Sequence, residues 1–149
     1  MSDVNPAALS KSELMAHWFQ RVWTDGDATA IHEMLAPDAV VRGLGNTDAV
    51  GPESFEFLQK SLLAQVTNVR FTILRTLEDE DWLAALWKMQ GQRKSDGAPV
   101  ETTGTVFVQV KDGKFVTGFD HFDAIGLFQD IGILPKDTVP RLFQGQALV

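Results

Sequence analysis

The segment "GFDHFD", residues 118–123, holds the side chains of this sequence that are best suited to acid–base chemistry. Aspartate is depleted in the interior of β-strands, yet Asp120 lies between aromatic residues in a segment with strand-like alternation. A carboxyl group that loses water among phenylalanine side chains has a raised pKa, which suits it to proton exchange near neutral pH. Asp120 is therefore the candidate general acid–base. The alternative that the sequence leaves open is a rim carboxylate paired with Arg42, Lys88 or water.

Strand geometry separates the polar residues of this segment. Alternate side chains of a strand share a face, so Asp120 and Phe122 lie on one face and His121 lies on the other. The sequence does not show which face lines a cavity, so His121 is the alternative catalytic base, and otherwise a surface or dimer-contact residue. Asp123 follows at the point where the strand gives way to a helix, and this position predicts an N-cap.

Composition removes several other kinds of site. The chain of 149 residues has no cysteine, which excludes thiolate nucleophiles, disulfides and zinc–sulfur sites. Its three histidines are scattered without the spacing of a metal-binding motif, so we expect no metal ion and no cofactor. The net charge of −7 and the lack of a Lys/Arg cluster argue against nucleic acid and an anionic membrane surface as partners. No segment is typical of a signal peptide or a membrane span, and we expect a cytoplasmic protein.

The elements that must position Asp120 follow from hydrophobic periodicity, which is helical in the first half of the chain and strand-like in the second. Ser10 and Glu13 form a capping box that opens the first helix, Asp27 caps the second, and Pro52 fits the first turn of the third. The expected helices are 11–24, 28–36, 52–66 and 124–131, and the expected strands are 39–45, 69–78, 82–92, 101–110 and 115–122.

Helices followed by a meander of long strands predict an α+β fold, in which a strongly bent antiparallel sheet wraps around the N-terminal helices. Such a sheet often leaves an apolar cavity between its inner face and the helices. The candidate substrate-binding residues on the apolar side are Trp18, Trp23, Trp87, Met89 and Phe122, with core packing as their alternative role. Arg42 is a further candidate, which either binds an anionic or enolate oxygen or is solvated or ion-paired. No repeat or linker divides the chain, so we expect one domain over 1–149, with loose tails at 1–9 and 136–149.

Five motifs follow one another between Leu14 and Pro135: "WTDGD", "LAPDAVV", "GPESFEFL", "KDGKFVTGFDHFD" and "GLFQDIGILP". In this order they resemble the SnoaL-like polyketide cyclase family of the nuclear transport factor two-like superfamily. The resemblance implies a cone-shaped barrel, usually paired with a second copy, and a general acid–base aspartate near the end of the last long strand, at Asp120. Limonene-epoxide hydrolases are similar here, with an aromatic residue two positions on, at Phe122.

Two departures from these relatives narrow the chemistry. The chain has no tyrosine, so it lacks the tyrosine oxyanion donor of ketosteroid isomerases. The strand "ALWKMQGQ" carries Lys88 and Gln90 where the epoxide hydrolases have an Arg-x-Asp pair. Epoxide hydrolysis by that route is therefore not expected.

The residues and the resemblance together indicate a SnoaL-like small-molecule enzyme of the cyclase or isomerase type. Asp120 would transfer a proton on a hydrophobic, carbonyl-bearing, polyketide-like substrate. Two alternatives stay open, namely a non-catalytic module of the same fold that binds a hydrophobic ligand, and a dimeric scaffold. We also expect a homodimer paired through the sheet, because a half-exposed sheet rich in valine and phenylalanine would leave an apolar face in water.

Overall fold

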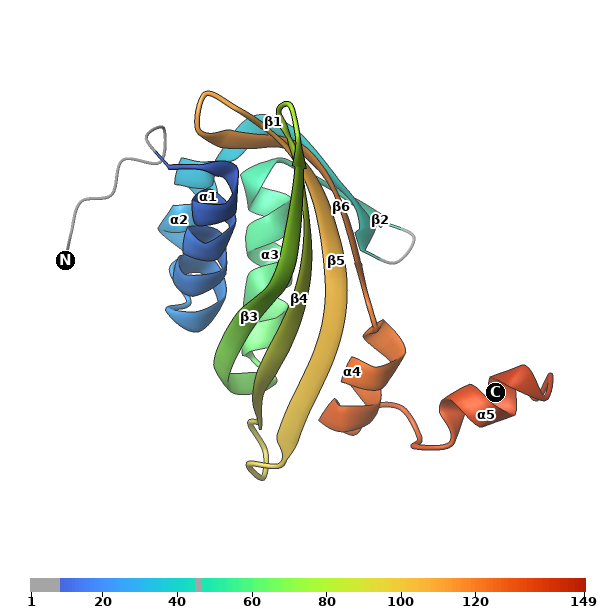
Figure 1. Ribbon diagram of the computed structural model, residues 1–149. Helices are drawn as coiled ribbons and strands as arrows, with labels where there is room; N and C mark the ends of the chain where they lie inside the picture. Colours follow the sequence, from blue (N-terminus) through green and yellow to red (C-terminus); the bar gives the residue numbers. More distant parts are fainter. Residues whose placement is uncertain (1–8, 45–46) are drawn as a thin grey trace.

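The computed structural model describes residues 9–44 and 47–149, and these residues form an α+β fold (Figure 1). The helices are α1 (Lys11–Trp18), the π-helix η2 (Phe19–Thr24), α2 (Ala28–Met34), α3 (Gly51–Leu63), α4 (Ala124–Ile131) and α5 (Thr138–Phe143). The strands are β1 (Leu35–Leu44), β2 (Thr47–Val50), β3 (Val66–Asp79), β4 (Trp82–Arg93), β5 (Pro99–Lys111) and β6 (Lys114–Phe122). Of the loose tail expected at residues 1–9, residues 1–8 lie outside the described residues.

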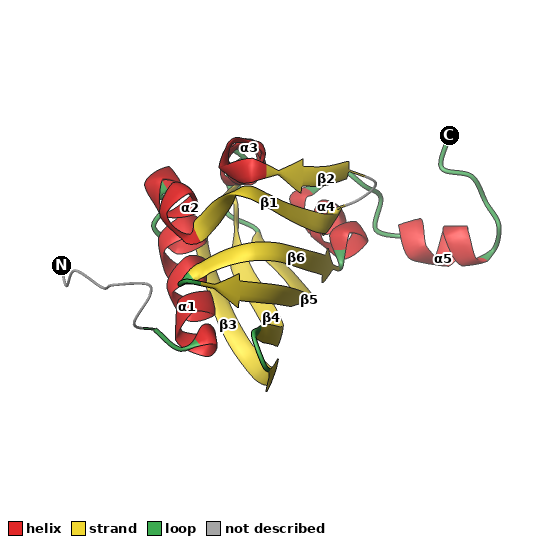
Figure 2. Cartoon of the chain, turned by 90° about the horizontal axis from the view of Figure 1, so that it is seen from above, coloured by secondary structure: helices red, strands yellow, loops and turns green. Residues whose placement is uncertain are grey.

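The strands form one sheet in the order β2-β1-β6-β5-β4-β3. The sheet curls around the helices without closing, as Figure 2 shows from above. Strands β3 to β6 pair antiparallel, since tight turns join them, but β1 and β6 pair parallel. The predicted antiparallel meander of long strands is confirmed, and the parallel pairing of β1 with β6 is an addition that the sequence pattern did not predict. No turn fixes the relative direction of these two strands, because helix α3 and three long strands separate them along the chain.

Side-chain caps begin the predicted helices. The Ser10 side chain accepts a hydrogen bond from the amide of Glu13, and the Glu13 carboxylate accepts one from the amide of Ser10, which completes the predicted capping box. Asp27 caps α2 by accepting from the amide of Thr29 at 2.9 Å. Asp123 caps α4 by accepting from the amide of Gly126 at 2.9 Å. These three caps confirm the predicted helix starts.

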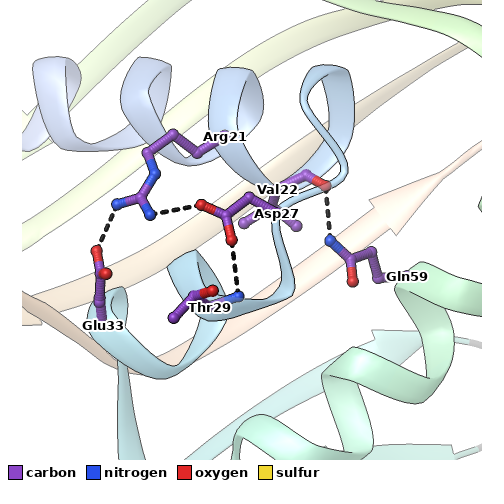
Figure 3. A network of polar contacts seen from close by, with 6 residues as sticks. All are labelled: Arg21, Val22, Asp27, Thr29, Glu33 and Gln59. Carbon is purple, nitrogen blue, oxygen red and sulfur yellow. Dashed lines mark hydrogen bonds and ion pairs between the residues drawn. The ribbon is translucent and has the colours of Figure 1, made fainter. Parts of the chain in front are cut away.

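The first helix differs from its prediction, because its second half is a π-helix. The buried Gln59 side chain of α3 donates to the carbonyl oxygen of Val22 at 2.8 Å, within this segment. Arg21 of η2 also forms ion pairs with Asp27, at 2.6 Å, and with Glu33 of α2 (Figure 3). π-turns are rare interruptions of α-helices, and helical periodicity alone did not reveal this one.

The sheet has two different faces. Its inner face, packed under the helices, buries the alternating residues Leu83, Ala85, Trp87 and Met89 of β4. The outer face exposes Leu77, Leu86, Phe107 and Phe119. This exposed apolar group, called the outer-face patch below, has Trp82 stacked on Phe107 with ring centroids 4.7 Å apart.

Two short elements were not predicted. Strand β2 is only four residues long and is recognisable by its pairing with β1. Helix α5, six residues long, lies inside the segment 136–149 that the sequence predicted as a loose tail. Over the described ranges, none of the helices combines the length and apolar character needed to cross a membrane.

Candidate active site

A pocket of about 350 Å³ lies between the helices and the inner face of the sheet. Helices supply Trp18, Phe19, Trp23 and Phe55 to its wall, and strands supply Phe71, Trp87, Met89, Val106, Phe115 and Phe122. The rings form a connected aromatic cluster, with Phe19 stacked on Phe71 at 4.4 Å and Trp18 edge-on to Phe55 at 5.0 Å. A pocket of this size and polarity suits a small apolar ligand.

The π-helix explains why two tryptophans five residues apart reach the same pocket. In η2 the amide of Asp25 donates to the carbonyl oxygen of Gln20 at 2.8 Å, which is the i to i+5 bond of a π-turn. The wider turn lets Trp18 and Trp23 both face the pocket, with Phe19 between them along the chain. Local unwinding of the helix thus increases its aromatic contribution to the site.

Asp120 lies on β6, directly opposite Val106 of β5, and both side chains line the pocket. The residue retains some accessible surface, as expected for a pocket wall, but its Oδ1 atom is completely buried and has no hydrogen-bond partner among the described residues. Native proteins rarely leave a buried polar atom unpaired, and such atoms often mark a functional site. Asp120 is therefore an unusual carboxyl group, because it lies within a strand and has a buried oxygen without a hydrogen-bond partner.

Burial raises the pKa of Asp120 from its usual 3.8 to about 7. The cause is desolvation, since the charged form loses its water and gains no compensating partner. Among the described residues that line the pocket, none is lysine, arginine or histidine, so no cation offsets this cost. Near neutral pH both the acid and the carboxylate are populated, as a group that gives and takes protons requires.

The structure does not bring two of the sequence-derived candidates into the pocket. His121 is exposed on the outer face of the sheet. Its ring packs against Gly43, and a Cβ atom on Gly43 would lie only 2.8 Å from His121 Cε1. Arg42 is exposed as well; it donates to Thr117 at 3.3 Å and lies over the Phe119 ring at 5.6 Å. The sheet curls so that Asp120, rather than His121, faces the helices. His121 and Arg42 therefore do not line the pocket.

The remaining sequence-derived candidates lie together. Trp18, Trp23, Trp87, Met89 and Phe122 line the same pocket as Asp120. Their role in binding a substrate remains a prediction.

Sequence reasoning missed the contribution of α4, which adds Ala124, Leu127 and Phe128 to the pocket wall. It also missed Gly104, whose isolated position inside a strand pattern was a usable signal of close approach by another group. No cluster of three or more metal-ligating side chains occurs in the part of the chain that the structure describes.

Comparisons with known proteins identify the family of the chain. Residues 15–117 match the SnoaL-like domain family, and the chain belongs to that family. No curated protein sequence matches the chain.

Several solved structures share the fold. A candidate SnoaL-like polyketide cyclase from Jannaschia sp. CCS1 is 15% identical, with a TM-score of 0.73 over 91% of this chain and 100% of that one. A candidate polyketide cyclase from Acidithiobacillus ferrooxidans is 19% identical, with a TM-score of 0.72 over 89% and 98% of the two chains. A hypothetical protein with a ketosteroid isomerase-like fold from Catenulispora acidiphila is 16% identical, with a TM-score of 0.72 over 84% and 96%. At these identities the similarity establishes the fold and not the reaction.

Proposed function

We propose that this protein is a cofactor-independent enzyme of the cyclase or isomerase type, in which Asp120 transfers a proton on a hydrophobic carbonyl compound. The observation that carries the proposal is the Asp120 carboxyl in an apolar pocket, whose Oδ1 atom is buried and unpaired and whose pKa is raised to about 7. Membership of the SnoaL-like domain family and the cyclase and isomerase-like structural neighbours support the same class of reaction.

The chemistry needs only this one titrating group. The Asp120 carboxylate removes a proton from the carbon next to a carbonyl, and the C–H electron pair moves onto the carbonyl oxygen to give an enolate. In an isomerisation, the neutral acid returns the proton to another carbon. In a ring closure, the enolate carbon forms a bond to a second carbonyl carbon of the same molecule, and the acid protonates the resulting alkoxide. Both routes regenerate the carboxylate, so no oxidant, reductant or cofactor is consumed.

The pocket also limits the substrate class. Its wall is apolar apart from Asp120 and a few hydroxyl, amide and indole groups, and the described lining has no cation to pair with an anionic substrate. A negative ligand would have to leave water without a counter-ion and would raise the cost of ionising Asp120 further. We therefore propose a neutral, mostly hydrophobic substrate with at least one carbonyl group.

Exchange of carbon-bound protons for deuterium tests the proposal without knowledge of the natural substrate. The probe is 2-tetralone, a neutral two-ring ketone, and NMR follows loss of its α-proton signals in deuterated buffer. The rate should rise with pH through about 7 and then level off, because the carboxylate form of Asp120 is the base. Asp120→Asn keeps the size of the side chain and removes its titration, so it should lower the rate by about 10²–10⁴-fold.

Asp123→Asn is the matched control, since it makes the same change three residues away at an exposed helix cap. It should exchange 2-tetralone at the rate of the unmodified protein. If Asp120→Asn also exchanges at that rate, the proposed role of Asp120 is wrong. Saturable 2-tetralone binding with no exchange above the buffer background would instead support the non-catalytic binding module.

A further inference from the structure

The pocket holds several hydrogen-bond donors besides a protonated Asp120, but most of them are already engaged. The hydroxyl and amide donors on its wall bond to backbone carbonyl oxygens: Ser61 to Phe57 at 2.8 Å, Gln65 to Ser61 at 3.2 Å, Thr102 to Asp123 at 2.8 Å and Thr117 to Val40 at 3.4 Å. The indole N–H groups of three tryptophans remain as donors for a ligand.

Trp87 stands out among these three. Its side chain is 4% exposed, and its Nε1 atom is buried without a hydrogen-bond partner in the described part of the chain. A buried donor left unpaired is costly, and a tryptophan N–H usually has a partner when it is buried. Among the described residues, Trp87 Nε1 and Asp120 Oδ1 are the two buried side-chain polar atoms that have no hydrogen-bond partner. Both residues line one pocket.

Gly104 makes room for the Trp87 ring on the pocket face of the sheet. Trp87 pairs with Gly104 across β4 and β5, and Gly104 pairs with Phe122 across β5 and β6. A Cβ atom on Gly104 would lie 2.5 Å from Trp87 Cζ2 and 2.7 Å from Phe122 Cβ, so the ring occupies the space that the missing side chain leaves. Cζ2 belongs to the same edge of the indole as Nε1. The edge of the ring that carries the N–H therefore lies over Gly104 of β5, between β4 and β6. On β6, Asp120 lies two residues before Phe122 on the same face.

We propose that the Trp87 N–H donates a hydrogen bond to the substrate carbonyl oxygen while Asp120 exchanges a proton on the adjacent carbon. This inference rests on the proposed function and adds the group that stabilises the enolate. When Asp120 takes the proton, the electron pair and the negative charge move to the oxygen, and they return when the proton is given back. A fixed N–H donor in an apolar pocket favours the charged oxygen without needing water to reorganise.

The same donor determines which ligands bind well. A carbonyl oxygen is an acceptor that satisfies the indole N–H, whereas a hydrocarbon of the same shape leaves it unpaired. Trp87 thereby supplies an oxyanion donor in a chain that has no tyrosine.

Indole ¹⁵N–¹H spectra of the intact protein test the hydrogen bond directly. The chain has four tryptophans, so four indole signals are expected, and Trp87→Phe assigns the one of interest by its loss. Saturation with 2-tetralone should move the Trp87 N–H proton signal downfield. Tetralin, which has the same two rings and no oxygen, separates hydrogen bonding from mere filling of the pocket and should not produce that shift. Equal effects of the two compounds on the Trp87 signal would overturn the inference.

Proton exchange of 2-tetralone gives the second readout. Trp87→Phe keeps an aromatic ring and removes the donor, so the maximal rate should fall by about 10²–10³-fold, while the rate still rises with pH through the same midpoint. Trp82→Phe is the control, since it makes the same change on the outer face, away from the pocket.

The two proposals fail in different ways. If Asp120→Asn loses exchange but Trp87→Phe keeps the full rate, the proposed function stands and the role of Trp87 is wrong. If Asp120→Asn keeps the full rate, the proposed function itself fails. The shift of the Trp87 signal, measured in the unmodified protein, decides the hydrogen bond even where Trp87→Phe does not fold.

Discussion

Replacing Asp120 with asparagine should change how stability depends on pH. The unfolding free energy of the Asp120→Asn protein, measured relative to that of the unmodified protein, should be higher at alkaline pH than at acidic pH. The Asp120 pKa is 3.8 in its ordinary state and about 7 in the fold. Between these two values the unfolded chain has lost the proton and the folded chain has kept it. The free energy of unfolding therefore falls as pH rises through this window, because the folded state binds more protons.

The size of the effect follows from the two pKa values. At about 1.36 kcal/mol per pKa unit, a rise from 3.8 to about 7 corresponds to roughly 4 kcal/mol of lost stability above neutral pH. Well below pH 3.8 the carboxyl is protonated in both states and the loss vanishes. Asparagine has nearly the same shape and does not titrate, so the Asp120→Asn protein escapes this loss.

The assay is urea unfolding of both proteins from about pH 4 to about pH 8.5, at one fixed protein concentration. The difference in unfolding free energy, variant minus unmodified protein, should grow by about 4 kcal/mol over this range. Asp123→Asn measures the effect of losing an exposed carboxylate by the same substitution. A stability difference for Asp120→Asn that is constant with pH, or that grows toward acidic pH, would refute the raised pKa of the Asp120 carboxyl in the folded state.

Two further outcomes are expected. Asp123→Ala removes the acceptor for the Gly126 amide and should cost about 1 kcal/mol of stability in urea unfolding, with 2-tetralone exchange retained; a loss of exchange would contradict a purely structural cap. We propose a homodimer through the outer-face patch, where Phe107 is 46% exposed, so light scattering at micromolar concentration should report a dimer and Phe107→Lys should shift it toward monomer. A monomeric unmodified protein would rule this assembly out.

The sequence alone determined the local structure and the two possible faces of the last strand. Helix starts were readable because Ser10, Asp27 and Asp123 satisfy backbone amides a few residues away. The long strands were readable from their alternation, and that alternation already placed Asp120 and His121 on opposite faces. Such features depend on neighbours in the chain, so they are visible without a fold.

Only the tertiary structure decided which face became the site. The direction in which the sheet curls puts Asp120 under the helices and leaves His121 outside, and neither residue's neighbours in sequence encode that choice. The π-helix accepts a hydrogen bond at Val22 from Gln59, which is far along the chain and is brought there only by the fold. The raised pKa of Asp120 and the unpaired N–H of Trp87 are set by every group that surrounds them. Desolvation is a property of a closed three-dimensional environment, and no single stretch of sequence contains it.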